Sequence, residues 1–393
     1  MIVINQIKVE VDKNNFNDAS RTDALIKKDI AKKLRLKSAS DVSAYKIIKK
    51  SLDARKKPVL FYIYSVVLDM KMPPKADKKF VSDYKKEKYK FPYAGAGNVA
   101  QKSGKRPVVV GFGPGGMFSA LLLARAGFKP IVLERGMDAD SRSRDVEEYW
   151  NGGKLKLNSN VQFGEGGAGT FSDGKLYTGI GKSAGRVDFV LETFADAGAN
   201  EDILYEAHPH IGTDVLCDVV KNIRKEIINL GGEVRFNSLF DSIKTENGEV
   251  VGCTYTDLTD NTTNSIETDS IILAIGHSAR DTFRLLRDSN VNMEAKGFAV
   301  GMRVIHKQSI IDRFTYGDSN DDGTFPASDY KLTVHTENGR GVYSFCMCPG
   351  GYVVDSSSEN ERICVNGMSC SDRNSGYANS AIIVNCDPGD FGD

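Results

Sequence analysis

Long apolar runs are missing from this 393-residue sequence, in which no stretch reaches the roughly 18 uninterrupted apolar residues of a membrane-spanning helix. The opening residues, MIVINQIKVEVDKNN, also lack the cationic start, apolar core and small-residue cleavage site of a secretory signal. Cysteine is scarce, and its seven scattered positions favour reduced thiols over a disulfide framework. We therefore expect a cytoplasmic protein without a membrane partner.

Metal-binding patterns are absent as well. Cys346 and Cys348 are the only cysteines close in sequence, and C-x-C without a second pair lacks the spacing of zinc motifs. His208 and His210 form an H-x-H pair for which no third ligand is evident. We predict no metal ion. For the two cysteines, a redox role and a role as bystander thiols both remain open.

Net charge is zero over the whole chain but is unevenly distributed. Residues 1–105 hold 25 Lys and Arg against 11 Asp and Glu, a net +14, which the remaining residues balance. Such a basic segment can bind nucleic acid. The alternative is a solvated lysine-rich surface, which the scattered lysines and few interleaved aromatics favour. Nucleic acid is thus a candidate partner that the composition does not favour.

Changes in composition along the chain predict four regions. Residues 1–73 read as a small α+β module, with a ferredoxin-like arrangement as one candidate, in which residues 43–55 form a second helix. Residues 74–105 read as a linker. An α/β, Rossmann-like dinucleotide-binding domain at 106–285 and a β-rich substrate region at 286–393 follow.

The sequence GFGPGG at 111–116 matches the G-x-G-x-x-G fingerprint of dinucleotide-binding proteins. It follows the apolar run PVVV and precedes a helical pattern, so we expect a strand–turn–helix that begins a βαβ unit. Gly111 permits the tight turn, Gly113 lets the backbone approach a pyrophosphate, and Gly116 allows close helix packing. Pro114 and Gly115 complete the turn, where the helix dipole favours phosphate. A mere tight turn in an α/β core is the alternative.

Glu134 strengthens the dinucleotide interpretation. It stands eighteen residues beyond Gly116, at the end of the next apolar run, where an acidic residue accepts hydrogen bonds from a ribose. Its charge would repel a 2′-phosphate, which disfavours NADP as the bound nucleotide. The fingerprint alone does not distinguish NAD from FAD.

A second glycine-rich stretch, QFGEGGAGTFSDGKL at 162–176, interrupts the simple βαβα order. It lacks the G-x-x-x-x-G-K-[ST] pattern of a nucleotide-hydrolase loop. A flexible linker is the alternative, against which the interleaved Phe163 and Phe171 argue. We predict a second clamp on a large dinucleotide, with backbone amides or side chains contributed by Gly164, Gly166, Gly167, Gly169, Thr170 and Ser172.

These motifs, with ILAIGHSARD, GFAVGMRVIHKQSIID and YSFCMCPGGYVV, resemble the bacterial FAD-dependent dehydrogenase-like proteins, also labelled NAD(FAD)-utilising dehydrogenases, of the two-dinucleotide-binding-domain flavoproteins. The resemblance implies an oxidoreductase in which a non-covalent FAD transfers hydride or electrons to or from a small-molecule substrate. NADH or NADPH is the candidate electron donor. A flavoprotein acting on RNA through the basic module, or a catalytically inert nucleotide-binding protein, are the alternatives.

The resemblance also implies cofactor contacts. The adenosine half would lie over the first glycine turn and Glu134 with Arg135 close by, and the flavin side near the second stretch. More loosely, it places adenine against Val234 and Phe236 and packs the strand ending at Ala274 and Gly276 on the cofactor.

Two departures from the family pattern affect these expectations. Ile305 precedes His306 where the family often has Glu, and no late glycine-rich closing segment follows, so we expect a C-terminally incomplete version of a longer protein. No catalytic acid or base is identified. Arg303, His306, Cys346 and Cys348 are the substrate-side candidates.

Overall fold

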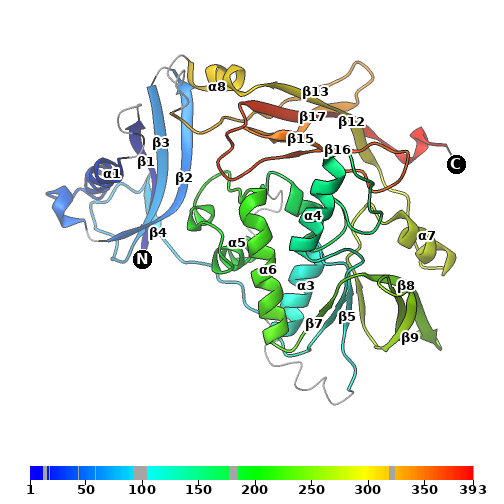
Figure 1. Cartoon of the computed structure of the whole chain (residues 1–393). Helices are drawn as coiled ribbons and strands as arrows, with labels where there is room; N and C mark the ends of the chain where they lie inside the picture. Colours follow the sequence, from blue (N-terminus) through cyan, green and yellow to red (C-terminus); the bar gives the residue numbers. More distant parts are fainter. Residues whose placement is uncertain are drawn as a thin grey trace.

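The computed structural model has a mixed α/β architecture built on several sheets, as expected from the sequence (Figure 1). No helix among the residues that it describes is long and apolar enough to cross a membrane. The described residues are 1–11, 16, 18–42, 44–57, 59–91, 104–176, 185–317 and 324–392.

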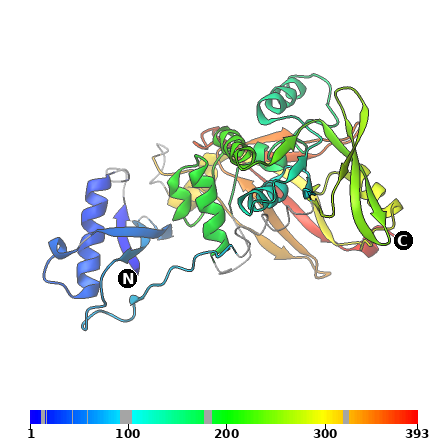
Figure 2. The same ribbon diagram turned by 90° about the horizontal axis from the view of Figure 1, so that it is seen from below.

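The N-terminal module is a four-stranded sheet with one long helix packed on it, and Figure 2 shows it as a separate lobe at one end of the molecule. The helix predicted for residues 43–55 is wrong, because this stretch forms a strand that pairs along its length with the next one. A fourth strand comes from the stretch expected to be a linker. The elements are β1 (Ile2–Val11), α1 (Ala19–Leu34), β2 (Tyr45–Lys56), β3 (Val59–Leu68) and β4 (Val81–Asp83), in the order β2-β3-β1-β4.

The core of this module includes residues from far along the chain. Ile26 and Ile30 of α1 lie buried against the sheet, and Tyr316 and Phe325 join the same apolar cluster. Lys50 of β2 also forms an ion pair with Glu206, 2.8 Å between Nζ and Oε1. The module is therefore anchored to the rest of the molecule by both apolar and polar contacts.

A four-stranded parallel sheet lies at the centre of the second lobe. The predicted βαβ unit is confirmed, because β5 (Val108–Val110) and β6 (Ile131–Leu133) are parallel neighbours with α3 (Pro114–Arg125) between them in sequence. β7 (Glu233–Arg235) and β11 (Ile271–Leu273) complete the order β11-β5-β6-β7. The strands β5, β6 and β7 follow one another in one direction, and β11 is then added on the other side of β5. Open α/β sheets bind ligands at such a switch point in strand order.

The two faces of the parallel sheet carry different layers (Figure 1). Val109 and Val132 pack toward the helices, whereas Val108 and Val110 pack toward an antiparallel sheet, as the alternation of side chains along a strand requires. Helices on one face and strands on the other bury both sides of the sheet. The helical layer contains α3, α5 (Arg186–Asp196) and α6 (Thr213–Asn229), and the second sheet contains β8 (Ser238–Glu246), β9 (Glu249–Asp257) and β10 (Thr262–Glu267).

Residues beyond α7 (Arg280–Asp288) are rich in strands, in line with their composition. An antiparallel sheet in the order β12-β17-β14-β13 and a two-stranded sheet β15-β16 lie above α3, α5 and α6 in the view of Figure 1. The elements are β12 (Phe298–Lys307), α8 (Gln308–Tyr316), β13 (Thr333–His335), β14 (Gly341–Cys348), β15 (Tyr352–Asp355), β16 (Val365–Met368) and β17 (Tyr377–Cys386).

Candidate functional site

The glycine turn between β5 and α3, residues 111–116, is hereafter the first loop. Gly111 has φ +93°, and a Cβ there would lie 2.5 Å from the carbonyl oxygen of Ala274. At Gly116 a Cβ would lie 1.9 Å from the carbonyl oxygen of Gly111. Both contacts are too short for any side chain, so these two positions require glycine for the turn and for helix packing.

Gly113 and Gly115 differ, because the space beside each would admit a methyl group in ordinary van der Waals contact. The nearest atoms to a built Cβ are 3.7 Å away at Gly113 and 3.9 Å away at Gly115. Gly113 is the N-cap of α3, has extended φ and ψ of −71° and −177°, and makes no side-chain cap. Pro114 takes the first helical position, where it lacks an N–H that would need a partner. The free amides of the first turn of α3 thus face this space.

The stretch 162–176, hereafter the second loop, lies directly on the first loop. A Cβ at Gly167 would lie 2.8 Å from the Cα of Gly113, and the Gly166 amide donates to the Phe112 carbonyl oxygen at 2.9 Å. Gly164, Gly166 and Gly167 all have positive φ. Two glycine-rich segments fifty residues apart therefore meet at the start of α3.

Arg142, on α4 (Ala139–Trp150), holds the second loop in shape. Its side chain is fully buried, and its guanidinium donates to four carbonyl oxygens. The acceptors are Asn160 at 2.8 Å, Glu165 at 2.6 Å, and Val161 and Gly167 at 2.8 Å each. Sequence reasoning did not find this residue, because an arginine on a polar helix gives no signal that it points inward.

The acidic and hydroxyl side chains of the second loop hold its shape and join it to neighbouring elements. Glu165 is fully buried, accepts from the Ala139 amide at 2.8 Å and pairs with Arg224 at 3.1 Å; burial raises the pKa of its carboxyl. Thr170 donates to the Glu165 carbonyl oxygen at 3.2 Å. Ser172 donates to the Gly169 carbonyl oxygen at 2.7 Å. The two hydroxyls are thus already engaged as donors inside the loop.

Glu134 joins three segments of the site. Its carboxylate accepts from the backbone amides of Phe112 at 2.7 Å, Gly136 at 2.9 Å and Gly164 at 2.9 Å, and the residue is 4% exposed. A carboxylate has about four lone-pair positions, so one acceptor position is left for a further donor. The predicted ribose acceptor therefore lies between both loops, with most of its capacity already used.

Arg135 closes the space beside Glu134. Its guanidinium pairs with Asp281 at 2.9 Å, donates to Thr282 Oγ1 at 3.0 Å and lies 4.5 Å above the Phe163 ring. The cavity left here, bordered also by Gly111, measures about 30 Å³. It has room for about one water molecule. A nucleoside would fit only after Arg135 and its neighbours move.

The remaining predicted cofactor contacts divide into two groups. Ala274 follows β11 and touches the first loop, with its carbonyl oxygen against Gly111, while Gly276 has φ +70° and open space around it. Val234 and Phe236, which were expected to contact adenine, precede the antiparallel hairpin of β8 and β9. Val234 is in β7 of the parallel sheet and both side chains pack on the helical layer, since the hairpin is formed by β8 and β9.

The substrate-side candidates also separate. Arg303 donates to the Cys346 carbonyl oxygen at 3.1 Å, and Cys348 lies two residues further along the same strand. His306, three positions from Arg303, points to the other face of β12 by strand alternation and lies 5.5 Å from the Tyr330 ring. Burial lowers the pKa of His306. Arg303 therefore groups with the cysteines, whereas His306 lies on the opposite face of β12.

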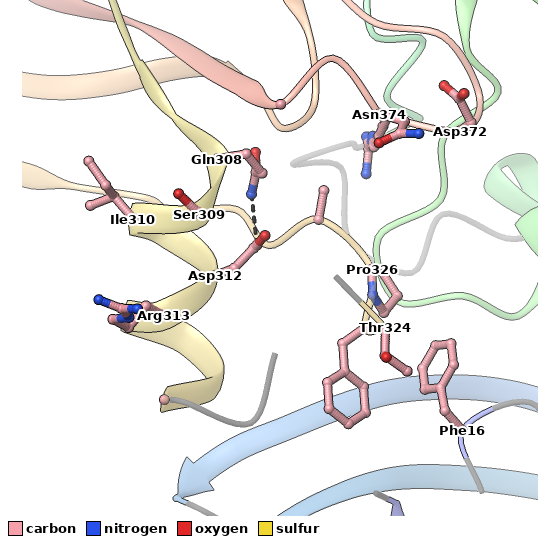
Figure 3. A pocket seen from close by; sticks show the side chains of 15 residues that line it. Phe16, Gln308, Ser309, Ile310, Asp312, Arg313, Thr324, Pro326, Asp372 and Asn374 are labelled. Carbon is pink, nitrogen blue, oxygen red and sulfur yellow. Dashed lines mark hydrogen bonds between the residues drawn. The ribbon is translucent and has the colours of Figure 1, made fainter. Parts of the chain in front are cut away.

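A larger cleft of about 910 Å³ lies between the N-terminal module and the β-rich region (Figure 3). Gln308 and Asp312 of α8 form one wall, joined by a hydrogen bond of 2.8 Å, and Phe16 and Pro326 form the opposite side. None of these residues belongs to the two glycine-rich loops. The cleft therefore lies apart from the residues that were predicted to bind a nucleotide.

Solved structures similar to this chain are flavoproteins. They include the FAD-complexed glycerol-3-phosphate dehydrogenase from Bacillus halodurans, 14% identical, covering 76% of this chain and 51% of that one with a TM-score of 0.36. A flavoprotein/dehydrogenase from Cytophaga hutchinsonii is 15% identical, covers 73% and 56%, and has a TM-score of 0.32. This chain spans only about half the length of each, and likeness at this level carries no argument about its chemistry.

Comparisons of sequence are more specific. The family model described as FAD-dependent protein, C-terminal domain-like matches residues 297–393, and one described as Domain of unknown function (DUF8436) matches residues 1–69. An uncharacterized protein from Clostridium beijerinckii is 46% identical over 384 residues, which cover 96% of this chain and 70% of that protein. The chain belongs to the family of this Clostridium beijerinckii protein, and its residues 297–393 match the FAD-dependent C-terminal domain model.

Proposed function

We propose that this chain binds FAD non-covalently at the junction of its two glycine-rich loops and uses it as an oxidoreductase. The observation that carries the proposal is the contact of Gly167 with Gly113 at the N-terminus of α3. A Cβ on Gly167 would come within 2.8 Å of the Gly113 Cα. Two backbone segments without side chains, set against a helix N-terminus, suit a pyrophosphate.

Each loop would supply a distinct part of the site. The first-turn amides of α3 and its dipole would hold the pyrophosphate over Gly113. The second loop would lie against the ribitol and flavin with the backbone of Gly166, Gly167 and Gly169, which carries no side chain, in a shape fixed by Arg142. The remaining acceptor position of Glu134 suits a ribose hydroxyl. When bound, FAD supplies the hydride or electron transfer, and the protein supplies orientation and electrostatics.

Entry of the adenosine half requires the Arg135–Asp281 pair to open. Asp281 is 55% exposed and Arg135 is 12% exposed in their side chains, so the pair is partly solvated. Exposed ion pairs contribute about 0–1 kcal/mol, which is small beside the binding free energy of about 8 kcal/mol for a micromolar ligand. The narrow cavity of this structure is therefore compatible with FAD binding after a local side-chain rearrangement.

The absorption spectrum of the purified protein, before and after addition of FAD and gel filtration, tests the proposal. We expect a flavin band that stays with the protein and bleaches anaerobically with NADH or NADPH. The comparison of the two donors also tests the expectation of a nicotinamide electron donor. A protein that elutes without flavin after incubation with excess FAD, while remaining folded by circular dichroism, would contradict the cofactor assignment.

A further inference from the structure

Cys346 and Cys348 lie together on an irregular part of β14. Pairing with β17 shifts register between Phe345 and Cys348, and Cys346 has φ +47°, a value rare for a residue with a side chain. The Cys348 thiol donates to the Cys346 carbonyl oxygen at 3.3 Å, and the two thiols are close enough for each to shift the pKa of the other. The bulge thus sets two thiols side by side.

Two cations flank this pair from different parts of the chain. Lys175, at the end of the second loop, donates to the Met347 carbonyl oxygen between the two cysteines. Arg303 approaches from β12 and donates to the Cys346 carbonyl oxygen at 3.1 Å. Together with the Cys348 S–H, these charges lower the pKa of the Cys346 thiol, while its neighbour and burial raise the pKa of Cys348. One thiol is therefore prepared as a thiolate and the other remains protonated.

The acidic groups near the pair are already occupied. Asp173 lies 3.3 Å from Lys175 Nζ, but its carboxylate also accepts from Arg373 Nε at 3.1 Å and from Ser369. The residue is 1% exposed and held between these donors. The thiol pair therefore faces a local excess of positive charge.

Around the thiols the packing leaves polar groups without partners. Arg303 Nε and Asn379 Nδ2 are buried and have no hydrogen-bond partner among the described residues, and Asn379 is fully buried. A Cβ at Gly367 would come within 2.6 Å of Cys348 Sγ and 2.5 Å of Asn379 Oδ1, so only glycine fits at this position of β16. Cys346 itself is only partly buried. Unsatisfied donors beside a reachable thiol suggest an acceptor-bearing ligand.

We propose that Cys346 and Cys348 form a thiol–disulfide exchange site whose substrate is a disulfide. The Cys346 thiolate attacks one sulfur of the substrate, its S–S bond breaks, and the first half leaves as a thiolate that takes the proton of Cys348. Cys348 then attacks the Cys346 sulfur and releases the second half as a thiolate. Two electrons pass from the protein dithiol to the substrate disulfide, and a Cys346–Cys348 disulfide remains.

This exchange uses only the two protein thiols and the substrate disulfide. It is independent of FAD binding, so a failure of the proposed cofactor site and a failure of the exchange site are separately visible. Arg303 and Lys175 are positioning residues in this scheme, because they act on the thiolate without taking part in bond exchange.

The test uses the full chain, reduced, freed of reductant and exposed to oxidised glutathione, then alkylated and mapped by peptide mass spectrometry. We expect wild type to gain a Cys346–Cys348 disulfide, and Cys348→Ser to stop as a glutathione adduct on Cys346. Cys346→Ser should give neither product at Cys348. Cys364→Ser, which removes an exposed thiol elsewhere, should leave the disulfide yield unchanged.

A second variant pair tests the role of charge. We add Lys175→Met to the Cys348→Ser protein and measure glutathione adduct formation on Cys346. If loss of the Lys175 charge raises the pKa of the Cys346 thiol by about one unit, this rate should fall about tenfold near pH 5. Lys175→Arg should restore most of the rate. Wild-type protein in which both cysteines stay fully alkylatable while Cys364 takes up glutathione would overturn the proposal, as would a Cys346 adduct that Cys348 never resolves.

Discussion

Replacing Arg142 should damage the second loop more than any other single change on α4. Arg142→Met keeps much of the side-chain volume but leaves the carbonyl oxygens of residues 160, 161, 165 and 167 without their charged donor. Hydrogen bonds to charged groups contribute about 1.5–3 kcal/mol each, and removing one partner of a buried charged network costs about 3–5 kcal/mol. Since four bonds share one guanidinium, we expect a loss of about 3–5 kcal/mol in unfolding free energy.

Urea denaturation followed by circular dichroism measures this loss, and limited proteolysis reports whether the second loop opens first. Arg144→Met is the matched control, because Arg144 is on the same helix, is exposed and bonds only to Ser141 among the contacts described. It should change stability by less than about 0.5 kcal/mol. A loss below about 1 kcal/mol for Arg142→Met, or equal losses for the two variants, would refute the assignment of Arg142 as the organiser of the loop.

Two further predictions concern packing and pH. Gly116→Ala places a methyl 1.9 Å from the Gly111 carbonyl oxygen and should cost more than about 2 kcal/mol in urea denaturation, whereas Gly115→Ala should be neutral; equal effects would contradict the packing argument. His208 pairs with Asp329 at 3.5 Å, and this hydrogen bond raises the pKa of His208. The contribution of the pair to folding stability is therefore fully present below about pH 6.5 and is lost as the pH rises through the raised pKa. An NMR titration midpoint for His208 at or below that of a model histidine would contradict it.

The parallel-strand unit could be predicted because its signals are local. A buried β-branched run, a glycine turn and a helical pattern coincide at 107–125, and the structure has β5, the first loop and α3 there. The error at 43–55 has the opposite cause. The apolar spacing of residues 43–55 suits a helix equally well. These residues form a strand because β3 supplies backbone hydrogen-bond partners along their length.

The site was accessible from sequence only where glycine geometry mattered. Gly111 and Gly116 are required by contacts that their spacing already implied. Arg142 and Arg224 carried no signal, because the carbonyl oxygens and the Glu165 carboxylate that they meet are brought near by the fold. The grouping of Arg303 with Cys346 likewise depends on β17, which lies between β12 and β14 in the sheet. Local sequence patterns do not predict the order of strands from distant segments.

Titration of the purified protein with FAD, followed by flavin fluorescence, tests the central claim most directly when Gly113→Ala and Gly115→Ala are compared. Gly113 has ordinary backbone angles, and a Cβ there would only touch Gly167 Cα at 3.7 Å, so the methyl should leave stability unchanged while occupying the proposed place of the pyrophosphate. We predict saturable binding by wild type and Gly115→Ala, and affinity weakened at least about tenfold, or about 1.4 kcal/mol, by Gly113→Ala. Equal FAD affinity for all three proteins, or no binding by wild type, would contradict the account.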